Sequence, residues 1–142
     1  MARLPVLMYH NVSGNFTNSK GLTISVQKLE EQFKYLSENY TSLHLSELEK
    51  TENIAPKSIV ITFDDVTVNQ LEYAVPLLHK YNLKAVFFIP FHFVGKTDEW
   101  NNGAEPIMNV NQLKSIDAKI VEFGYHSFKH RHYSRLSDEE IN

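Results

Sequence analysis

The sequence predicts an α/β fold with parallel strands, formed by a single domain. Apolar runs of strand length alternate with stretches in which apolar residues recur at helical spacing. Two of these runs, residues 58–63 and 83–89, show no regular polar alternation, which is typical of parallel strands that are buried on both faces. The length of 142 residues fits one domain with a hydrophobic core, and we find no internal repeat or linker.

The first elements are a strand and a well-marked helix. The apolar run of residues 4–9 ends at His10, and turn residues follow it. Ser25 is a suitable cap for a helix that ends near residues 39–40, because Val26, Leu29, Phe33 and Leu36 recur on one face. We expect a short strand at 43–45 next, and a brief helix opened by the capping box that Ser46 and Glu49 would form.

The middle of the chain predicts two further units of strand and helix. The strand at 58–63 leads into a helix over residues 68–81, in which Pro76 either introduces a kink or delays the start. Asn82 is a plausible residue to end that helix, and the strand at 83–89 stops at Pro90. After an irregular segment, residues 110–116 predict a short helix and residues 119–123 a further strand.

The chain ends on the start of a helix. Ser137 and Glu140 have the spacing of a capping box, but the sequence stops at Asn142 after barely one turn. Because a single turn does not repay the cost of helix nucleation, we expect that the sequence is cut from a longer one or that its reading frame ends early.

Composition narrows the possible functions. The net charge of −3 offers no basic surface for nucleic acid, so we expect no such partner. The chain contains no cysteine, which excludes disulfides, thiolate metal sites and a cysteine nucleophile. No apolar stretch is long enough to span a bilayer, and the N-terminus lacks the features of a signal peptide.

Two polar clusters follow predicted strands, about sixty residues apart. Asp64 and Asp65 come directly after one apolar run, and His126 and His130 follow another. The carboxyl ends of parallel strands are where α/β folds carry their chemistry. One carboxylate and two imidazoles can hold a divalent metal, and the second carboxylate can then act as a base. The pattern therefore indicates a metal-dependent hydrolase.

Simpler interpretations exist for each cluster taken alone. An acid pair before a helix is often an N-terminal cap, and a histidine-rich loop is often only solvated. The presence of both clusters at strand ends of one domain favours the catalytic interpretation. His10 also follows a strand and would line the same cavity, although a simple turn histidine is an equal alternative.

The same residues resemble a known family. The segments T-F-D-D at 62–65 and H-S-F-K-H at 126–130 resemble the first two motifs of the polysaccharide deacetylases, carbohydrate esterase family four. Residues 6–12, 84–89 and 135–140 extend the resemblance over nearly the whole chain. The opening is most similar to the branch that acts on poly-N-acetylglucosamine exopolysaccharides.

The resemblance implies a fold, a reaction and a site. The fold would be the N-terminal part of a distorted (β/α) barrel, with residues 1–142 forming a catalytic domain that lacks its C-terminal portion. Asp64 would be the general base, while Asp65, His126 and His130 would bind a divalent ion, most plausibly zinc. The substrate would be an N-acetylated polysaccharide that loses its acetyl groups. From its position after the first strand, His10 would be a substrate-binding residue at the same cavity. The expected location is the cell envelope or the extracellular space.

Two other functions stay open at this point. Val66 stands where the family motif has glycine, and no later family motif follows His130, so the chain would also fit a sugar- or metal-binding remnant without turnover. A non-haem iron oxygenase shares the set of two histidines and one carboxylate. The second aspartate and the parallel α/β pattern favour hydrolysis.

Overall fold

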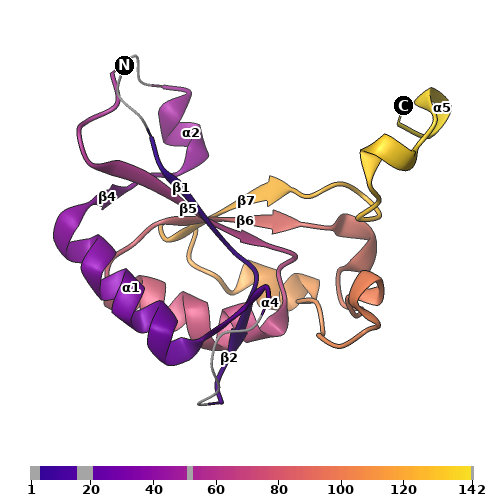
Figure 1. Cartoon of the computed structure of the whole chain (residues 1–142), viewed down its shortest axis with the longest axis horizontal. Helices are drawn as coiled ribbons and strands as arrows, with labels where there is room; N and C mark the ends of the chain where they lie inside the picture. Colours follow the sequence, from indigo (N-terminus) through magenta and orange to yellow (C-terminus); the bar gives the residue numbers. More distant parts are fainter. Residues whose placement is uncertain (1–3, 16–20, 51–52, 142) are drawn as a thin grey trace.

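A parallel sheet forms the centre of the computed structural model, which describes residues 4–15, 21–50 and 53–141. The strand order is β1 (Val6–Tyr9), β5 (Ser58–Asp64), β6 (Ala85–Ile89) and β7 (Val121–Tyr125), and the short β4 (Thr41–Ser42) also pairs with β5. All of these pairings are parallel, which confirms the predicted fold class. Over the described residues the sheet is open, with β1 and β7 at its ends (Figure 1).

An aromatic cluster fixes the first helix against the sheet. Helix α1 (Val26–Asn39) begins at the predicted cap, where the Ser25 Oγ accepts a hydrogen bond from the Lys28 N–H at 3.3 Å. Its fully buried Phe33 packs edge-on against Tyr9 and Phe63, and Phe63 lies 4.9 Å from Phe87 between ring centres. These rings join α1 to three neighbouring strands. Burial of Tyr9 also raises the pKa of its hydroxyl to about 12.

The region after α1 differs from the expectation. Residues 43–45 do not form the expected strand. Strand pairing in this region is confined to β4, and helix α2 (Leu45–Leu48) starts at the last residue of the expected strand. His44 caps α2, and the Glu47 carboxylate accepts a hydrogen bond from the His44 N–H at 2.8 Å. The expected capping box of Ser46 and Glu49 is therefore wrong, since the observed one lies two residues earlier, at His44 and Glu47. Buried His44 fills the cap position because its ring also contacts the Ile120 carbonyl.

Pro76 divides the expected helix at 68–81. A π-helical segment, η1 (Gln70–Ala74), precedes the regular helix α3 (Val75–Lys80), in which the proline occupies the first turn. Proline has no N–H to donate and is tolerated at that position. Asn82 ends the helix as expected: it has a positive φ of 49°, and the Leu83 N–H donates back to the Leu78 carbonyl at 2.9 Å.

The remaining elements complete the described part of the chain. They are the parallel pair β2 (Asn11–Ser13) and β3 (Thr23–Ser25), the 3₁₀ turns η2 (Phe91–Phe93), η3 (Glu99–Asn101) and η4 (Tyr133–Arg135), and the helices α4 (Val110–Lys114) and α5 (Asp138–Ile141). In Figure 1, α1 and α4 lie on the same side of the sheet, while α5 projects beyond the end of β7. Among the described residues no helix is both long and apolar enough to cross a membrane.

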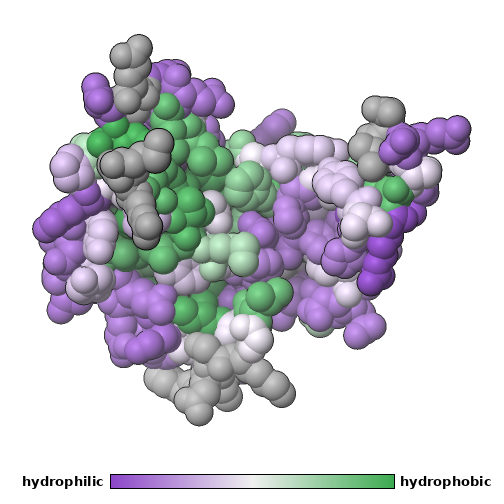
Figure 2. Space-filling model, turned by 45° about the horizontal axis from the view of Figure 1, so that its top comes forward, coloured by the Kyte–Doolittle hydropathy of each residue, from purple (hydrophilic) through white to green (hydrophobic). Residues whose placement is uncertain are grey.

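The other face of the sheet is partly uncovered at β1. Leu7 and Tyr9 pack toward the core, whereas Val6 and Met8 on the opposite face are 58% and 61% exposed. Figure 2 shows a hydrophobic area near the N-terminal strand on the face turned toward the viewer. The core of the described chain therefore lies mainly between the sheet and the helices on one side.

Candidate metal centre

Strand β6 brings the two polar clusters together, although it contributes none of their side chains. It lies between β5 and β7, and its last residues hold the chain just beyond both neighbours. The Asp65 N–H donates to the Phe88 carbonyl at 3.1 Å, and the His126 N–H donates to the Ile89 carbonyl at 3.0 Å. Because successive carbonyls of a strand point to opposite edges, one strand end fixes both loops. The expectation that both clusters meet at one edge depends on this register.

A glycine in β7 makes room for this arrangement. A Cβ atom on Gly124 would lie 2.5 Å from the nearest ring atom of Phe88, which is closer than real Cβ contacts allow. The Phe88 ring therefore lies against β7 at Gly124, with its centre 6.4 Å from that of the His126 ring. This packing keeps β6 and β7 in their observed register at the site.

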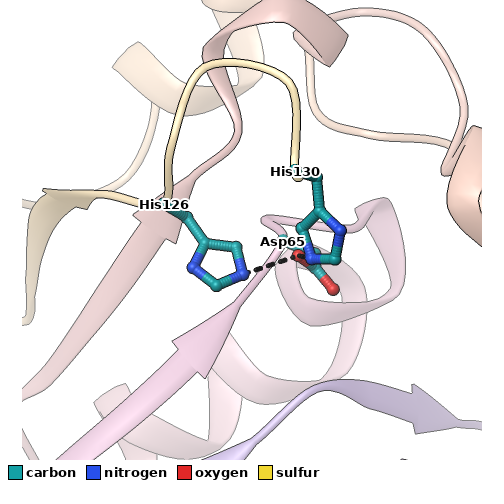
Figure 3. A group of neighbouring side chains, drawn as sticks. All are labelled: Asp65, His126 and His130. Carbon is teal, nitrogen blue, oxygen red and sulfur yellow. Dashed lines mark ion pairs between the residues drawn. The ribbon is translucent and has the colours of Figure 1, made fainter. Parts of the chain in front are cut away.

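Asp65, His126 and His130 converge on one point (Figure 3). The Nε2 atoms of both histidines lie 3.3 Å from the same oxygen, Asp65 Oδ1. All three residues offer ligand atoms within 4.8 Å of one another. Asp65 Oδ1 is buried, yet it accepts no hydrogen bond from any described residue. A buried carboxylate oxygen facing two imidazole nitrogens without a hydrogen bond is the arrangement expected of ligands that share a cation.

The spacing of these atoms fits a tetrahedral metal ion. Zinc binds histidine nitrogen and carboxylate oxygen at about 2.1 Å, so two ligands of a tetrahedral ion lie roughly 3.4 Å apart. The two observed nitrogen–oxygen distances of 3.3 Å agree with that value. Two imidazoles and one carboxylate are also a donor set that zinc and iron use. The residues of this chain therefore fit a divalent metal.

The electrostatics of the two histidines differ. The adjacent Asp65 carboxylate raises the pKa of the His126 imidazole, whereas burial lowers the pKa of His130. His130 is thus the more readily neutral of the two, and His126 is the more readily protonated. Because metal ligands must be deprotonated, an ion that binds here competes with the proton on His126.

Asp64 lies beside the three residues without joining them. Its side chain is 13% exposed, and burial raises the pKa of its carboxyl group. His10 lies next to it, with its Nε2 atom 3.6 Å from Asp64 Oδ2. The structure thus brings all five residues selected from the sequence, Asp64, Asp65, His126, His130 and His10, to one edge of the sheet.

The two loops that carry the candidate ligands, one after β5 and one after β7, have an unusual backbone. Asp65 has a φ of 76°, Val66 of 46°, Ser127 of 57° and His130 of 49°. Residues other than glycine seldom adopt this left-handed region, at a cost of about 1–2 kcal/mol each. Such conformations persist only where the surrounding structure enforces them, and they are common at functional sites.

An open cavity of about 500 Å³ lies over the site. Beyond His10, Asp64, His126 and His130, its lining residues are Tyr125, Ser127, Arg131, His132 and Tyr133. The two tyrosines are 60% and 57% exposed, so their rings are accessible. His132 lines the cavity but does not belong to the group of candidate ligands.

One supporting residue was not found from the sequence. Gln70 is fully buried, and its amide donates to the carbonyls of His10 at 3.0 Å and Asp64 at 2.6 Å. It therefore ties the end of β1 to the end of β5. Its polar side chain within an otherwise apolar helical face was the available signal.

Comparison with known proteins gives the family. Residues 51–142 match the family model described as polysaccharide deacetylase. YxkH from Bacillus subtilis (strain 168), whose name assigns it to the polysaccharide deacetylases, is 27% identical over 144 residues, which cover 98% of this chain.

Solved structures agree with the fold. The chain is similar to the Streptococcus pyogenes deacetylase PplD in complex with acetate, with a TM-score of 0.78 and 23% identity over 96% of this chain. It is also similar to IcaB from Ammonifex degensii, with a TM-score of 0.75 and 25% identity over 88% of this chain. The chain spans about half the length of these relatives: 47% of YxkH, 61% of PplD and 53% of IcaB. The family match, together with the acid and histidine clusters at the strand ends, shows that this chain belongs to the polysaccharide deacetylase family.

Proposed function

We propose that the chain is the metal-binding part of a hydrolase that removes N-acetyl groups from a polysaccharide containing N-acetylhexosamine. The observation that carries the proposal is the convergence of Asp65, His126 and His130 on one point, with a second carboxylate beside them. Family membership supports deacetylation of a polysaccharide as the reaction class.

Each residue has a role that follows from its position. We assign Asp65, His126 and His130 to the metal, because their ligand atoms form one compact group. Asp64 is the proton acceptor, because its carboxylate borders the cavity without sharing the ligand cluster. His10 Nε2 lies 3.6 Å from Asp64 Oδ2 and lines the same cavity, so we assign His10 to orienting that carboxylate and to contacting the substrate.

Asp65, His126 and His130 would hold the metal that supplies the electrophilic part of the chemistry. When bound, such an ion would lower the pKa of water in the site and would stabilise negative charge that develops on oxygen during acyl transfer. We infer zinc because both nitrogen–oxygen distances suit a tetrahedral ion, and because imidazole nitrogen and carboxylate oxygen are common zinc ligands. Asp64 accepts the proton that the attacking water loses. As the C–N bond of the acetamide breaks, that proton passes to the departing nitrogen, so acetate and a free amine are released.

The substrate and the extent of the domain are also part of the proposal. The exposed tyrosines of the cavity are suited to the faces of sugar rings. The acetate in the PplD complex is the product that such a reaction would release. We infer a poly-N-acetylglucosamine-type polymer at the cell envelope or outside the cell. Residues 1–142 would then form the N-terminal part of one catalytic domain.

Metal content and acetate release test this proposal together. We expect the chain, stripped with a chelator and reloaded, to retain one zinc ion, and Asp65→Asn to retain none because it loses the charged ligand. Asp64→Asn should keep the zinc but release acetate from N-acetylglucosamine oligomers at least about 100-fold more slowly, since it lacks the base. Asp117→Asn, at an exposed turn, is the matched control and should change neither.

Two results would contradict parts of the proposal. Zinc retention by Asp65→Asn equal to that of the unaltered chain would remove the metal assignment. Zinc binding without any acetate release by the unaltered chain would favour the alternative, a sugar- or metal-binding remnant. Val66, a buried β-branched residue at the position of the motif glycine, is the observation that favours this alternative.

A further inference from the structure

The segment after β6 folds into a hairpin next to the candidate metal centre. Residues 96–107, here called the Trp100 hairpin, are closed by an antiparallel bridge between Thr97 and Pro106. Asp98 lies inside the turn, only 2% exposed, and its carboxylate accepts hydrogen bonds from the Glu105 N–H at 2.7 Å and the Asn101 amide at 2.9 Å. The hairpin, which includes the 3₁₀ turn η3, is therefore a defined structure.

The hairpin is attached to the loop that carries the acids. The Val68 N–H donates to the Pro106 carbonyl at 2.8 Å, and the Met108 N–H donates to the Val66 carbonyl at 2.9 Å. A bridge between Thr67 and Ile107 lies between these two bonds. The position of the hairpin relative to Asp65 is thus fixed by the backbone.

The tip of the hairpin covers His130, the second histidine of the candidate site. The Trp100 ring is stacked on the His130 imidazole, with ring centres 4.0 Å apart and an angle of 16° between the planes. Phe93 holds the Trp100 ring in place, because the two rings meet edge-on with their centres 4.8 Å apart. Among the described residues His126 has no stacked ring of this kind: His130 meets it edge-on at 5.0 Å between ring centres, and the Phe88 ring centre is 6.4 Å away.

This stack acts on a ligand whose backbone is strained. His130 has a φ of 49°, and the last torsion of a histidine side chain is broad. Ligand histidines in metal sites need a second contact that sets the orientation of the ring. An indole lying parallel to the imidazole restricts its rotation while leaving the edge with Nε2 directed at Asp65 Oδ1.

We propose that Trp100 is a positioning residue of the metal centre, which holds the His130 imidazole in the plane required for metal binding. The inference rests on the proposed function, since it needs the metal that the function assigns to this site. Trp100 itself touches neither the metal nor the substrate in this role. Its effect is to preorganise one ligand through the hairpin that also contacts the acid loop.

The sequence provides a direct reporter of this arrangement. Trp100 is the single tryptophan of the chain, so all tryptophan emission comes from the stack. Cobalt(II), which occupies zinc sites and absorbs visible light, should strongly quench this emission when it saturates the unaltered chain. Excess zinc should restore the emission by displacing cobalt.

Substitutions of Trp100 distinguish a role in positioning His130 from a general structural role. Trp100→Ala should weaken cobalt and zinc binding roughly tenfold, measured by competition with a coloured chelator, because the ring of His130 is released. Its cobalt absorption bands should also shift as the ligand geometry changes. Trp100→Phe keeps an aromatic face and should restore most of the affinity. Phe91→Ala, which removes a 51% exposed ring that is tilted against Tyr125, is the control and should bind cobalt normally.

The outcomes distinguish this inference from the proposed function. If the unaltered chain binds no cobalt, or if Asp65→Asn binds it equally well, the metal assignment and the inference both fail. If the unaltered chain binds cobalt and folded Trp100→Ala binds it with the same affinity and the same bands, only the inference fails. Should Trp100→Ala not fold, unquenched tryptophan emission at saturating cobalt overturns the inference.

Discussion

Val66 combines two properties that oppose each other. It is completely buried, and it is a β-branched residue held at a φ of 46°. Burying a valine side chain contributes about 1.5–3 kcal/mol, whereas a left-handed backbone costs an L-residue roughly 1–2 kcal/mol. The side chain therefore compensates for a backbone conformation that glycine would adopt without strain.

This balance predicts an unusual order of stability for two variants. Val66→Gly and Val66→Ala both lose buried surface, but only alanine keeps the Cβ atom that opposes a positive φ. We expect Val66→Gly to be more stable than Val66→Ala by about 1 kcal/mol in urea unfolding. Ala74→Gly is the control, since Ala74 is equally buried at a φ of −76° and should lose about 1 kcal/mol. A more stable alanine variant at position 66 would show that the strain is absent.

The candidate ligands could be predicted from the sequence, but their supporting residues could not. Asp65 and His126 are the first residues after β5 and β7, so the end of an apolar run marks them. Trp100 and Gln70 act through contacts that depend on the hairpin and on the π-helical segment. Neither contact follows from periodicity, because both join residues whose spacing along the chain carries no regular pattern.

At the scale of elements, helix α1 has a simple start that allows a test of its cap. Ser25 precedes Val26 in an extended conformation, and its hydroxyl accepts from the Lys28 N–H. We expect Ser25→Ala to lower the free energy of unfolding by about 1 kcal/mol, measured by urea denaturation, since an N–H of the first turn loses its acceptor. Ser37→Ala, within the same helix, should cause no loss because alanine favours helices. Equal losses in both variants would argue against a capping role.

Elements with simple apolar periodicity, such as α1, could be predicted nearly to the residue. The errors occur where a polar side chain or a proline competes with that pattern. His44 takes the cap of α2 because its ring finds the Ile120 carbonyl, a contact across 76 positions that no local rule contains. Pro76 produces a π-helical segment before it, whereas the sequence indicated only a kink or a late start.

At the scale of the whole molecule, the candidate site joins parts that are distant along the chain. Asp65 comes from the middle of the sequence and His126 and His130 from near its end. A metal that binds only the folded chain stabilises it by mass action, by about 2.7 kcal/mol at a concentration 100 times the dissociation constant. We expect zinc to raise the melting temperature of the unaltered chain, measured by circular dichroism.

The matched variant for this measurement is His126→Ala, which removes one ligand and should melt at the same temperature with and without zinc. His79→Ala, at an exposed position of α3, should respond to zinc like the unaltered chain. A zinc-dependent rise that persists in His126→Ala would mean that the ion binds elsewhere.

The position of β6 between both loops has a consequence for the accuracy of folding. If β6 slipped by one residue, the carbonyls now on its two edges would exchange sides, and neither Asp65 nor His126 would find its acceptor. A misaligned chain would then lack the pocket for the ion altogether. A metal ion that binds at the proposed site would therefore stabilise only the chain whose sheet has the observed register.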